Sequence, residues 1–137
     1  MYVAIPKELN SLEPRVAATP GSIKQIIKSG LNVYVESGAG LKSFISDDAY
    51  QSSGANIIQS CKELLINADI TLKVLPPSNE EIDLLKEKSA FISLCQTTRE
   101  LETVRLLSKK KISAFSMHLI PRTSLAQKMD ALSSQAN

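Results

Sequence analysis

Short apolar runs alternate with amphipathic runs along this chain, and this alternation constrains the fold more than any other feature of the sequence. The apolar runs are rich in β-branched residues and span residues 2–5, 31–35, 55–58, 70–74, 90–94 and 111–116. The runs between them carry apolar residues at helical spacing, as in Ile23, Ile26 and Ile27. Because strands joined by helices need parallel crossovers, the order predicts an α/β fold. We expect an open, mostly parallel sheet with helices on both faces, in a flavodoxin-like or Rossmann-like three-layer arrangement.

Local signals mark where several of the helices begin. Thr19 followed by Pro20 is typical of an N-cap and the first residue of a helix. Three later segments have the capping-box form, in which a Ser or Thr is followed three residues later by a Glu. They are residues 60–63, 78–81 and 97–100.

The size and composition of the chain narrow the classes of protein to which it can belong. It has 137 residues, the length of one ordinary domain, with 43% hydrophobic residues, 22% charged residues and a formal net charge of +2. These values give no case for nucleic-acid binding, since the one basic run, residues 109–111, fits a solvated loop. No apolar stretch reaches the roughly 18 residues of a membrane span, and the N-terminus does not resemble a signal peptide. Cys61 and Cys95 lack metal-binding spacing, so we expect free thiols and no metal site. Free thiols are typical of a reducing compartment, so we expect a cytoplasmic location. Because no apolar stretch is long enough, we expect no direct membrane insertion.

Two basic residues lie where a ligand would be expected, because ligands of open parallel sheets bind beyond the carboxyl ends of the strands. Arg15 follows the first apolar run and could hold a carboxylate or a phosphate. Pairing with Glu13 or Glu8 in a surface loop is the interpretation that we favour for it. Lys73 lies inside the fourth apolar run. It could extend outward to solvent or point at an anionic ligand, and the sequence leaves both possibilities open.

Three other features at this edge have ordinary structural explanations. The stretch Ser-Gly-Ala-Gly at residues 37–40 lacks the third glycine of a dinucleotide-binding loop, so we interpret it as a turn. His118 is the only histidine and could act as a general base, but a solvated or core-edge histidine is the commoner outcome. We interpret Cys95, at the end of the fifth run, as a small buried side chain.

The segment of residues 120–137 concentrates hydrogen-bonding side chains, with few bulky apolar residues between them. Arg122, Gln127 and Asp130 could fix a polar, planar ligand from several directions, and Ser133 follows at helical spacing. A capped surface helix would explain the same residues, and the residue types alone leave the two interpretations open. Because a terminal tail needs no such concentration, we expect the chain to be one part of a larger assembly.

Three stretches of the sequence resemble a known family. They are IPKEL with EPRVAATP (residues 5–20), SGLNVYVESGAG (residues 29–40) and PRTSLAQKMDALSSQAN (residues 121–137). The whole chain, residues 1–137, resembles the N-terminal domain shared by alanine dehydrogenases and the NAD(H)-binding alpha subunits of proton-translocating nicotinamide nucleotide transhydrogenases. The third stretch is the most specific and is similar to the transhydrogenase branch. The resemblance implies a single domain of a normally two-domain subunit, in which the dinucleotide fingerprint belongs to a second, Rossmann-type domain absent from this chain.

The same resemblance implies roles for the clustered polar residues. Arg122, Gln127, Asp130 and Ser133 match residues that hold the nicotinamide end of NAD(H) in the cleft between the two domains, and the first three would be the catalytic residues that orient it for hydride transfer. The side-chain chemistry agrees, since a carboxamide offers one acceptor and two donors. NADP(H) would be bound on a partner subunit.

One position separates the two branches of the family. The alanine dehydrogenase pattern combines an arginine in the EPRV segment, a lysine in the LKV strand and a histidine after the fifth strand. This chain keeps Arg15 and Lys73 but has Cys95 where the histidine would be. A thiol is a poor substitute for an imidazole base, which argues against amino-acid deamination. Direct hydride transfer between two nicotinamides needs no such base.

The resemblance therefore implies part of an NAD(P) transhydrogenase alpha subunit, which transfers hydride between NAD(H) and NADP(H) and couples the transfer to proton movement. The expected partners are the membrane and NADP(H)-binding components of the enzyme and a second alpha subunit in a homodimer, with the domain peripheral to the inner membrane. The chain alone should be inactive. The alternatives are an alanine dehydrogenase-type amino-acid oxidoreductase and a non-catalytic dimerisation module.

Overall fold

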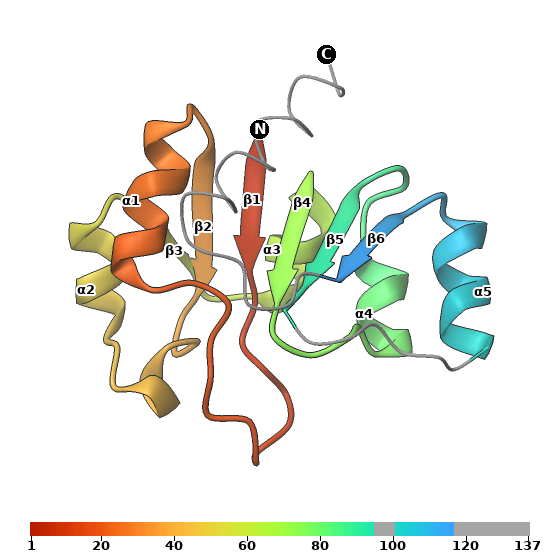
Figure 1. The fold of residues 1–137 in the computed structure, drawn as a ribbon, viewed down its shortest axis with the longest axis horizontal. Coiled ribbons are helices and arrows are strands. Elements are labelled where there is room, and N and C mark those ends of the chain that lie inside the picture. The colour runs from red at the N-terminus through yellow and green to blue at the C-terminus, as the bar shows by residue number, and fades with distance from the viewer. Residues whose placement is uncertain (95–100, 117–137) are drawn as a thin grey trace.

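The computed structural model describes residues 1–94 and 101–116, and its centre is a six-stranded sheet (Figure 1). The strands are β1 (Tyr2–Ile5), β2 (Asn32–Glu36), β3 (Asn56–Ile58), β4 (Ile70–Lys73), β5 (Ala90–Ser93) and β6 (Ser113–Ser116). They pair in the order β3-β2-β1-β4-β5-β6, and every pair is parallel. The predicted α/β class is confirmed, and the strand order is that of the Rossmann arrangement rather than the flavodoxin one.

Helices cover both faces of the sheet, as the alternation of strands and helices predicts. They are α1 (Pro20–Lys28), α2 (Asp47–Ser52), α3 (Cys61–Asn67), α4 (Asn79–Leu84) and α5 (Leu101–Lys109), with a short 3-10 helix, η1 (Leu41–Ser43). Successive side chains of β1 show the two layers, because they point to opposite faces. Val3 and Ile5 share a core cluster with Ile23 of α1, whereas Ala4 packs with Leu64 of α3. The core is thus divided between two layers, and the inner strands β1, β4 and β5 are buried from both sides.

Two predicted helix starts are present in the structure in full. Thr19 Oγ1 accepts a hydrogen bond from Ser22 N, and Ser22 Oγ accepts one from Thr19 N. Helix α1 therefore begins with a complete capping box. Ser78 Oγ accepts from Glu81 N at 3.1 Å, and Glu81 Oε1 accepts from Ser78 N at 2.9 Å. Each box satisfies two amides that the first helical turn leaves without partners. The capping box predicted at residues 97–100 lies outside the described residues.

The last strand is shorter than the sequence predicts. The apolar run begins at residue 111, but β6 begins at Ser113. Lys111 has a φ of 59°, in the left-handed region that interrupts an extended strand. Ile112 N then donates to Leu107 O, which ties the turn to the end of α5. Hydrophobic patterning predicts the strand but not the conformation of the turn before it.

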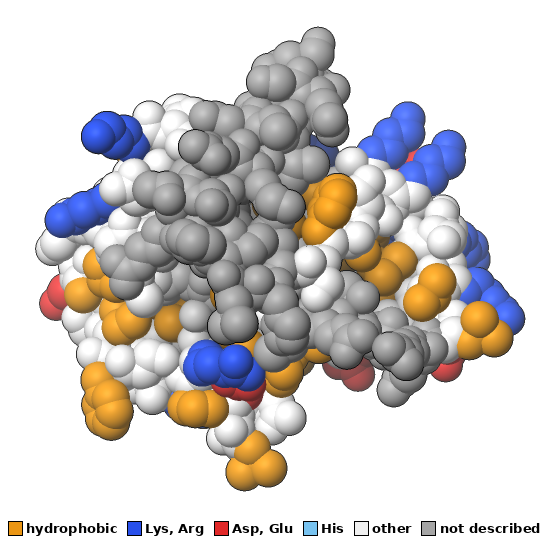
Figure 2. All heavy atoms as spheres, in the orientation of Figure 1, with side chains coloured by type: hydrophobic (Ala, Val, Ile, Leu, Met, Phe, Trp, Pro, Cys, Tyr) orange, Lys and Arg blue, Asp and Glu red, His pale blue; other side chains and the backbone are white. Residues whose placement is uncertain are grey.

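The distribution of basic side chains on the surface agrees with the low net charge of +2. On the face seen in Figure 2, the visible Lys and Arg side chains lie at both ends and at the lower edge and do not form one continuous patch. Within residues 1–94 and 101–116, no helix combines the length and the apolar character needed to cross a membrane.

Candidate functional site

A buried lysine stands at the carboxyl end of the sheet. Lys73 ends β4 and points to the face covered by α4, and only 4% of its side chain is exposed. Its Nζ donates to both carboxylate oxygens of Glu81, at 2.9 Å each, and lies 3.9 Å from Glu8 Oε1. Extension of Lys73 to solvent, one of the two possibilities left open by the sequence, is therefore excluded. The ammonium is held by the protein's own carboxylates.

Glu81 reaches this lysine because of how α4 begins. Ser78 caps the helix, and the reciprocal bond from Ser78 N fixes the Glu81 carboxylate at the first turn. The same oxygen, Oε1, also accepts from Lys73 Nζ. Two consecutive prolines, Pro76 and Pro77, stiffen the short connection between β4 and the cap. The helix start and the buried ion pair are thus one structural unit.

Glu8 completes the charged cluster from the other side. Its carboxylate accepts from Val74 N at 3.0 Å and from Leu75 N at 3.2 Å, across more than sixty residues of sequence. Burial raises the pKa of Glu8, while the two amide bonds and the nearby Lys73 ammonium act in the opposite direction. The Lys73 ammonium is thus bound by Glu81 and faced by Glu8, so it is not free for an incoming ligand.

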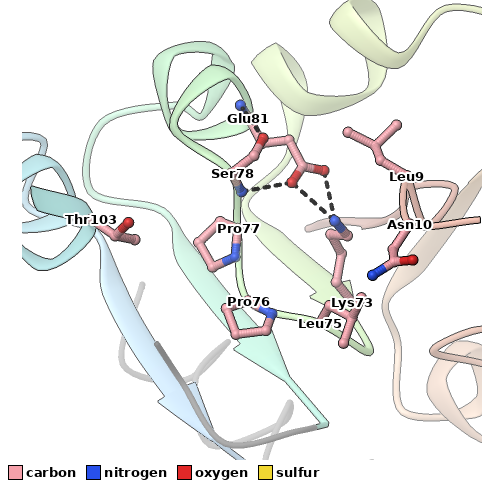
Figure 3. Close-up of a pocket in the computed structure, with 9 residues that line it drawn as sticks. All are labelled: Leu9, Asn10, Lys73, Leu75, Pro76, Pro77, Ser78, Glu81 and Thr103. Carbon is pink, nitrogen blue, oxygen red and sulfur yellow. Dashed lines mark hydrogen bonds and ion pairs between the residues drawn. The ribbon is translucent and has the colours of Figure 1, made fainter. Parts of the chain in front are cut away.

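A pocket of about 410 Å³ opens beside the cluster (Figure 3). It is lined by Leu9, Asn10, Lys73, Leu75, Pro76, Pro77, Ser78, Glu81 and Thr103. In Figure 3 the Glu81 carboxylate and the Lys73 ammonium face each other, with Leu9 and Asn10 on one side and the prolines on another. A partly apolar cavity with a few convergent polar groups is the usual form of a small-molecule site.

Arg15 has the role that we favoured for it. Its Nε lies 2.7 Å from Glu13 Oε1 and its second guanidinium nitrogen 2.9 Å from Oε2, in a bidentate pair. The hydrogen bond from Arg15 holds the pKa of Glu13 below its usual value. The Arg15 side chain remains 62% exposed, so this pair lies at the surface of the loop after β1.

The glycine-containing stretch after β2 is a turn, as predicted. Asp47 fixes it, because its carboxylate accepts from Ser37 Oγ at 2.6 Å and from Gly38 N at 2.9 Å. A Cβ on Gly40 would come within 2.8 Å of Ile45 and 2.7 Å of Tyr50. Close packing inside the domain thus explains the glycine at position 40. The bonds from Ser37 and Gly38 to Asp47 explain the turn, so dinucleotide binding is not needed to explain this stretch.

The residues assigned to nicotinamide binding are not among those that the structure describes. They are Arg122, Gln127, Asp130 and Ser133, and all four lie outside residues 1–94 and 101–116. The positions of Cys95 and His118 lie outside these ranges too. Their roles stay predictions.

The structure also adds two residues that sequence analysis did not assign to the site, Glu8 and Glu81. Glu81 was predicted only as the end of a capping box, and Glu8 only as a possible partner of Arg15. A lysine at the end of a buried strand is the signal that could have found them, because a buried ammonium requires a carboxylate nearby.

Comparison with known proteins places this geometry in a family. The model of the alanine dehydrogenase/PNT N-terminal domain matches residues 4–137. The NAD(P) transhydrogenase subunit alpha of Haemophilus influenzae is 42% identical over 137 residues, which is all of this chain and 26% of that protein. The alanine dehydrogenase of Bacillus subtilis is 34% identical over 120 residues, covering 88% of this chain and 32% of that protein.

Solved structures show the same two branches. The transhydrogenase of Sinorhizobium meliloti superimposes with a TM-score of 0.80 at 36% identity, covering 99% of this chain and 40% of that one. An L-alanine dehydrogenase gives 0.77 at 25% identity, covering 83% of this chain and 31% of that one. This chain therefore spans between a quarter and two fifths of the length of these relatives. The predicted resemblance is confirmed: the chain belongs to the alanine dehydrogenase/PNT N-terminal domain family.

Proposed function

We propose that this chain is the N-terminal part of an NAD(P) transhydrogenase alpha subunit and helps to bind NAD(H) for hydride transfer to NADP(H). The observation that carries the proposal is the identity of 42% with a transhydrogenase subunit alpha over the whole chain, against 34% with an alanine dehydrogenase over part of it. The solved structures rank in the same order, at 36% and 25% identity.

Within this function, Arg122, Gln127, Asp130 and Ser133 hold the nicotinamide end of NAD(H). Their side chains offer donors and acceptors that match a carboxamide, and orientation of the ring is what direct hydride transfer requires. The buried pair of Lys73 and Glu81 lies at the sheet edge that, by general rule, faces the ligand.

The wider assembly belongs to the same proposal. The transhydrogenase relative is named as a subunit, so we propose a complete enzyme in which NADP(H) binds on a partner component, the alpha subunit forms a homodimer, and hydride transfer is coupled to proton movement. Membrane association of this domain is then peripheral and cytoplasmic, through partner subunits.

Asp130→Asn in the complete subunit, assembled with its partners, tests the assigned site. We expect the rate of hydride transfer between NADH and an NADP analogue to fall by about one to two orders of magnitude, because an interaction that orients the transition state is lost. Glu102→Gln, on the exposed side of α5, is the matched control and should leave the rate unchanged. An unchanged rate in Asp130→Asn would favour a dimerisation module over a catalytic one. Reduction of NAD by alanine in the wild-type enzyme would instead support the alanine dehydrogenase alternative.

A further inference from the structure

The point of the sheet at which doubly wound proteins bind ligands is already filled in this chain. In the strand order β3-β2-β1-β4-β5-β6 the winding direction reverses between β1 and β4. Ligands of such sheets bind in the crevice outside the carboxyl ends of these two strands. Glu8 follows β1 and reaches the backbone that follows β4, so its carboxylate lies in this crevice.

The contacts of Glu8 are those of a bound anion. One oxygen accepts from Val74 N at 3.0 Å and the other from Leu75 N at 3.2 Å, while Lys73 Nζ stands 3.9 Å away. Only 3% of the Glu8 side chain is exposed. Successive backbone amides directed at one carboxylate, with a cation beside them, form the type of concave site in which proteins hold anions.

The usual phosphate-binding device is missing at the same point. Residues 6–19, between β1 and α1, contain no glycine, so the backbone has no glycine turn for a close approach to a pyrophosphate. At the start of α1, the amide of Ser22 is taken by the side chain of Thr19. On the other side of the crevice, the amides of Val74 and Leu75 are both directed at the Glu8 carboxylate.

We propose that Glu8 is the chain's own anionic ligand at this switch point, filling an anion site made by the amides of Val74 and Leu75 together with Lys73 and closing it to external carboxylates and phosphates. The same contact ties the loop after β1 to the loop after β4, and these loops carry Leu9 and Leu75, which both line the pocket. The proposal is independent of the proposed function, since it concerns a contact within the chain and is tested by stability.

Chemical rescue tests this proposal directly. Glu8→Ala removes the carboxylate and leaves both amides and the ammonium without it. We expect the melting temperature of the purified chain to fall by at least about 5 °C, and sodium acetate to restore a large part of that loss compared with sodium chloride at the same ionic strength. The wild-type chain should show no such difference between the two salts, because its site is filled. Glu13→Ala is the matched control, since it removes a glutamate whose guanidinium partner is 62% exposed.

Amide hydrogen exchange gives a second, residue-specific result. The amides of Val74 and Leu75 should exchange slowly in the wild-type chain, faster in Glu8→Ala, and slowly again when acetate is added. If Glu8→Ala is unfolded without acetate, addition of acetate should refold it, as measured by circular dichroism. Acetate that neither stabilises nor refolds Glu8→Ala beyond its effect on Glu13→Ala would overturn the proposal. So would a Glu8→Gln variant, which keeps the volume of the side chain, with unchanged melting temperature and unchanged exchange at both amides.

Discussion

At the scale of single residues, a buried lysine and two glutamates form the interior of this domain beside the pocket. Lys73 is buried and depends on Glu81, which gives it two short bonds, and on Glu8 at longer range. An ammonium removed from water is tolerated only when carboxylates compensate for its lost hydration. The sequence indicates that Lys73 is unusual, since it interrupts an apolar strand. It does not indicate which carboxylates pair with it, because Glu8 is more than sixty residues away along the chain.

Substitution of Glu81 should show how strongly this lysine depends on its partner. Glu81→Gln keeps the volume of the side chain and a capping oxygen but removes the charge. The free energy of unfolding should fall by about 3 kcal/mol. This is the lower end of the cost of breaking a buried ion pair, because Glu8 still faces Lys73. The measurement is urea denaturation. In the double variant with Lys73→Met, the cost should be clearly less than the sum of the two single costs. Strictly additive costs would mean that the two side chains do not interact.

At the scale of the elements, capping explains why α4 starts where it does and why its first turn faces the pocket. Ser78 and Glu81 exchange two backbone-to-side-chain bonds, and the box is visible in the sequence. The predicted strands and helices agree closely with the structure for the same reason, because apolar period and caps are local signals. The boundary of β6 is the exception, since Lys111 adopts a left-handed conformation that no residue type in this run specifies.

Loss of the cap should destabilise α4 by a modest, defined amount. Ser78→Ala removes the oxygen that accepts from Glu81 N, and we expect about 1 kcal/mol less free energy of unfolding in thermal or urea denaturation. Ser46→Ala is a matched control, because Ser46 caps α2 through Ala49 N with the same geometry and lines none of the pocket around Lys73. A cost for Ser78→Ala well above that for Ser46→Ala would show that the cap also supports the buried ion pair.

At the scale of the whole molecule, long-range contacts of Asp69 tie the inner strands of the sheet together. Asp69 lies before β4 and accepts from Tyr2 N at 2.8 Å and from Lys86, so it links β1 to the turn that leads into β5. Burial alone would raise the pKa of Asp69, but the bonds from Lys86 and Tyr2 outweigh it and hold the pKa below its usual value.

This direction predicts how stability depends on pH. A carboxyl group whose pKa is lower in the folded state stabilises the fold above its unfolded pKa of about 3.9, and this contribution is lost as the pH falls through the folded value. Asp69→Asn should therefore be less stable than the wild type at pH 6, and the gap should shrink steadily below about pH 4. Urea denaturation over a series of pH values measures this difference in the free energy of unfolding between Asp69→Asn and the wild type. Glu87→Gln, at an exposed position, is the control, and a gap for Asp69→Asn that is independent of pH would contradict the assignment.

The sequence by itself determined the class of the fold, the starts of α1, α3 and α4 and the family, because these depend on local period, capping residues and contiguous motifs. It also placed Lys73 and Arg15 at the ligand-binding edge and favoured the pairing of Arg15 with Glu13, which is two residues away. The tertiary structure decided what surrounds Lys73, since only the parallel pairing of β1 with β4 brings Glu8 to the amides of Val74 and Leu75. It also decided the Rossmann strand order, because pairing between strands is set by how helices pack on the two faces and leaves no mark in any one segment.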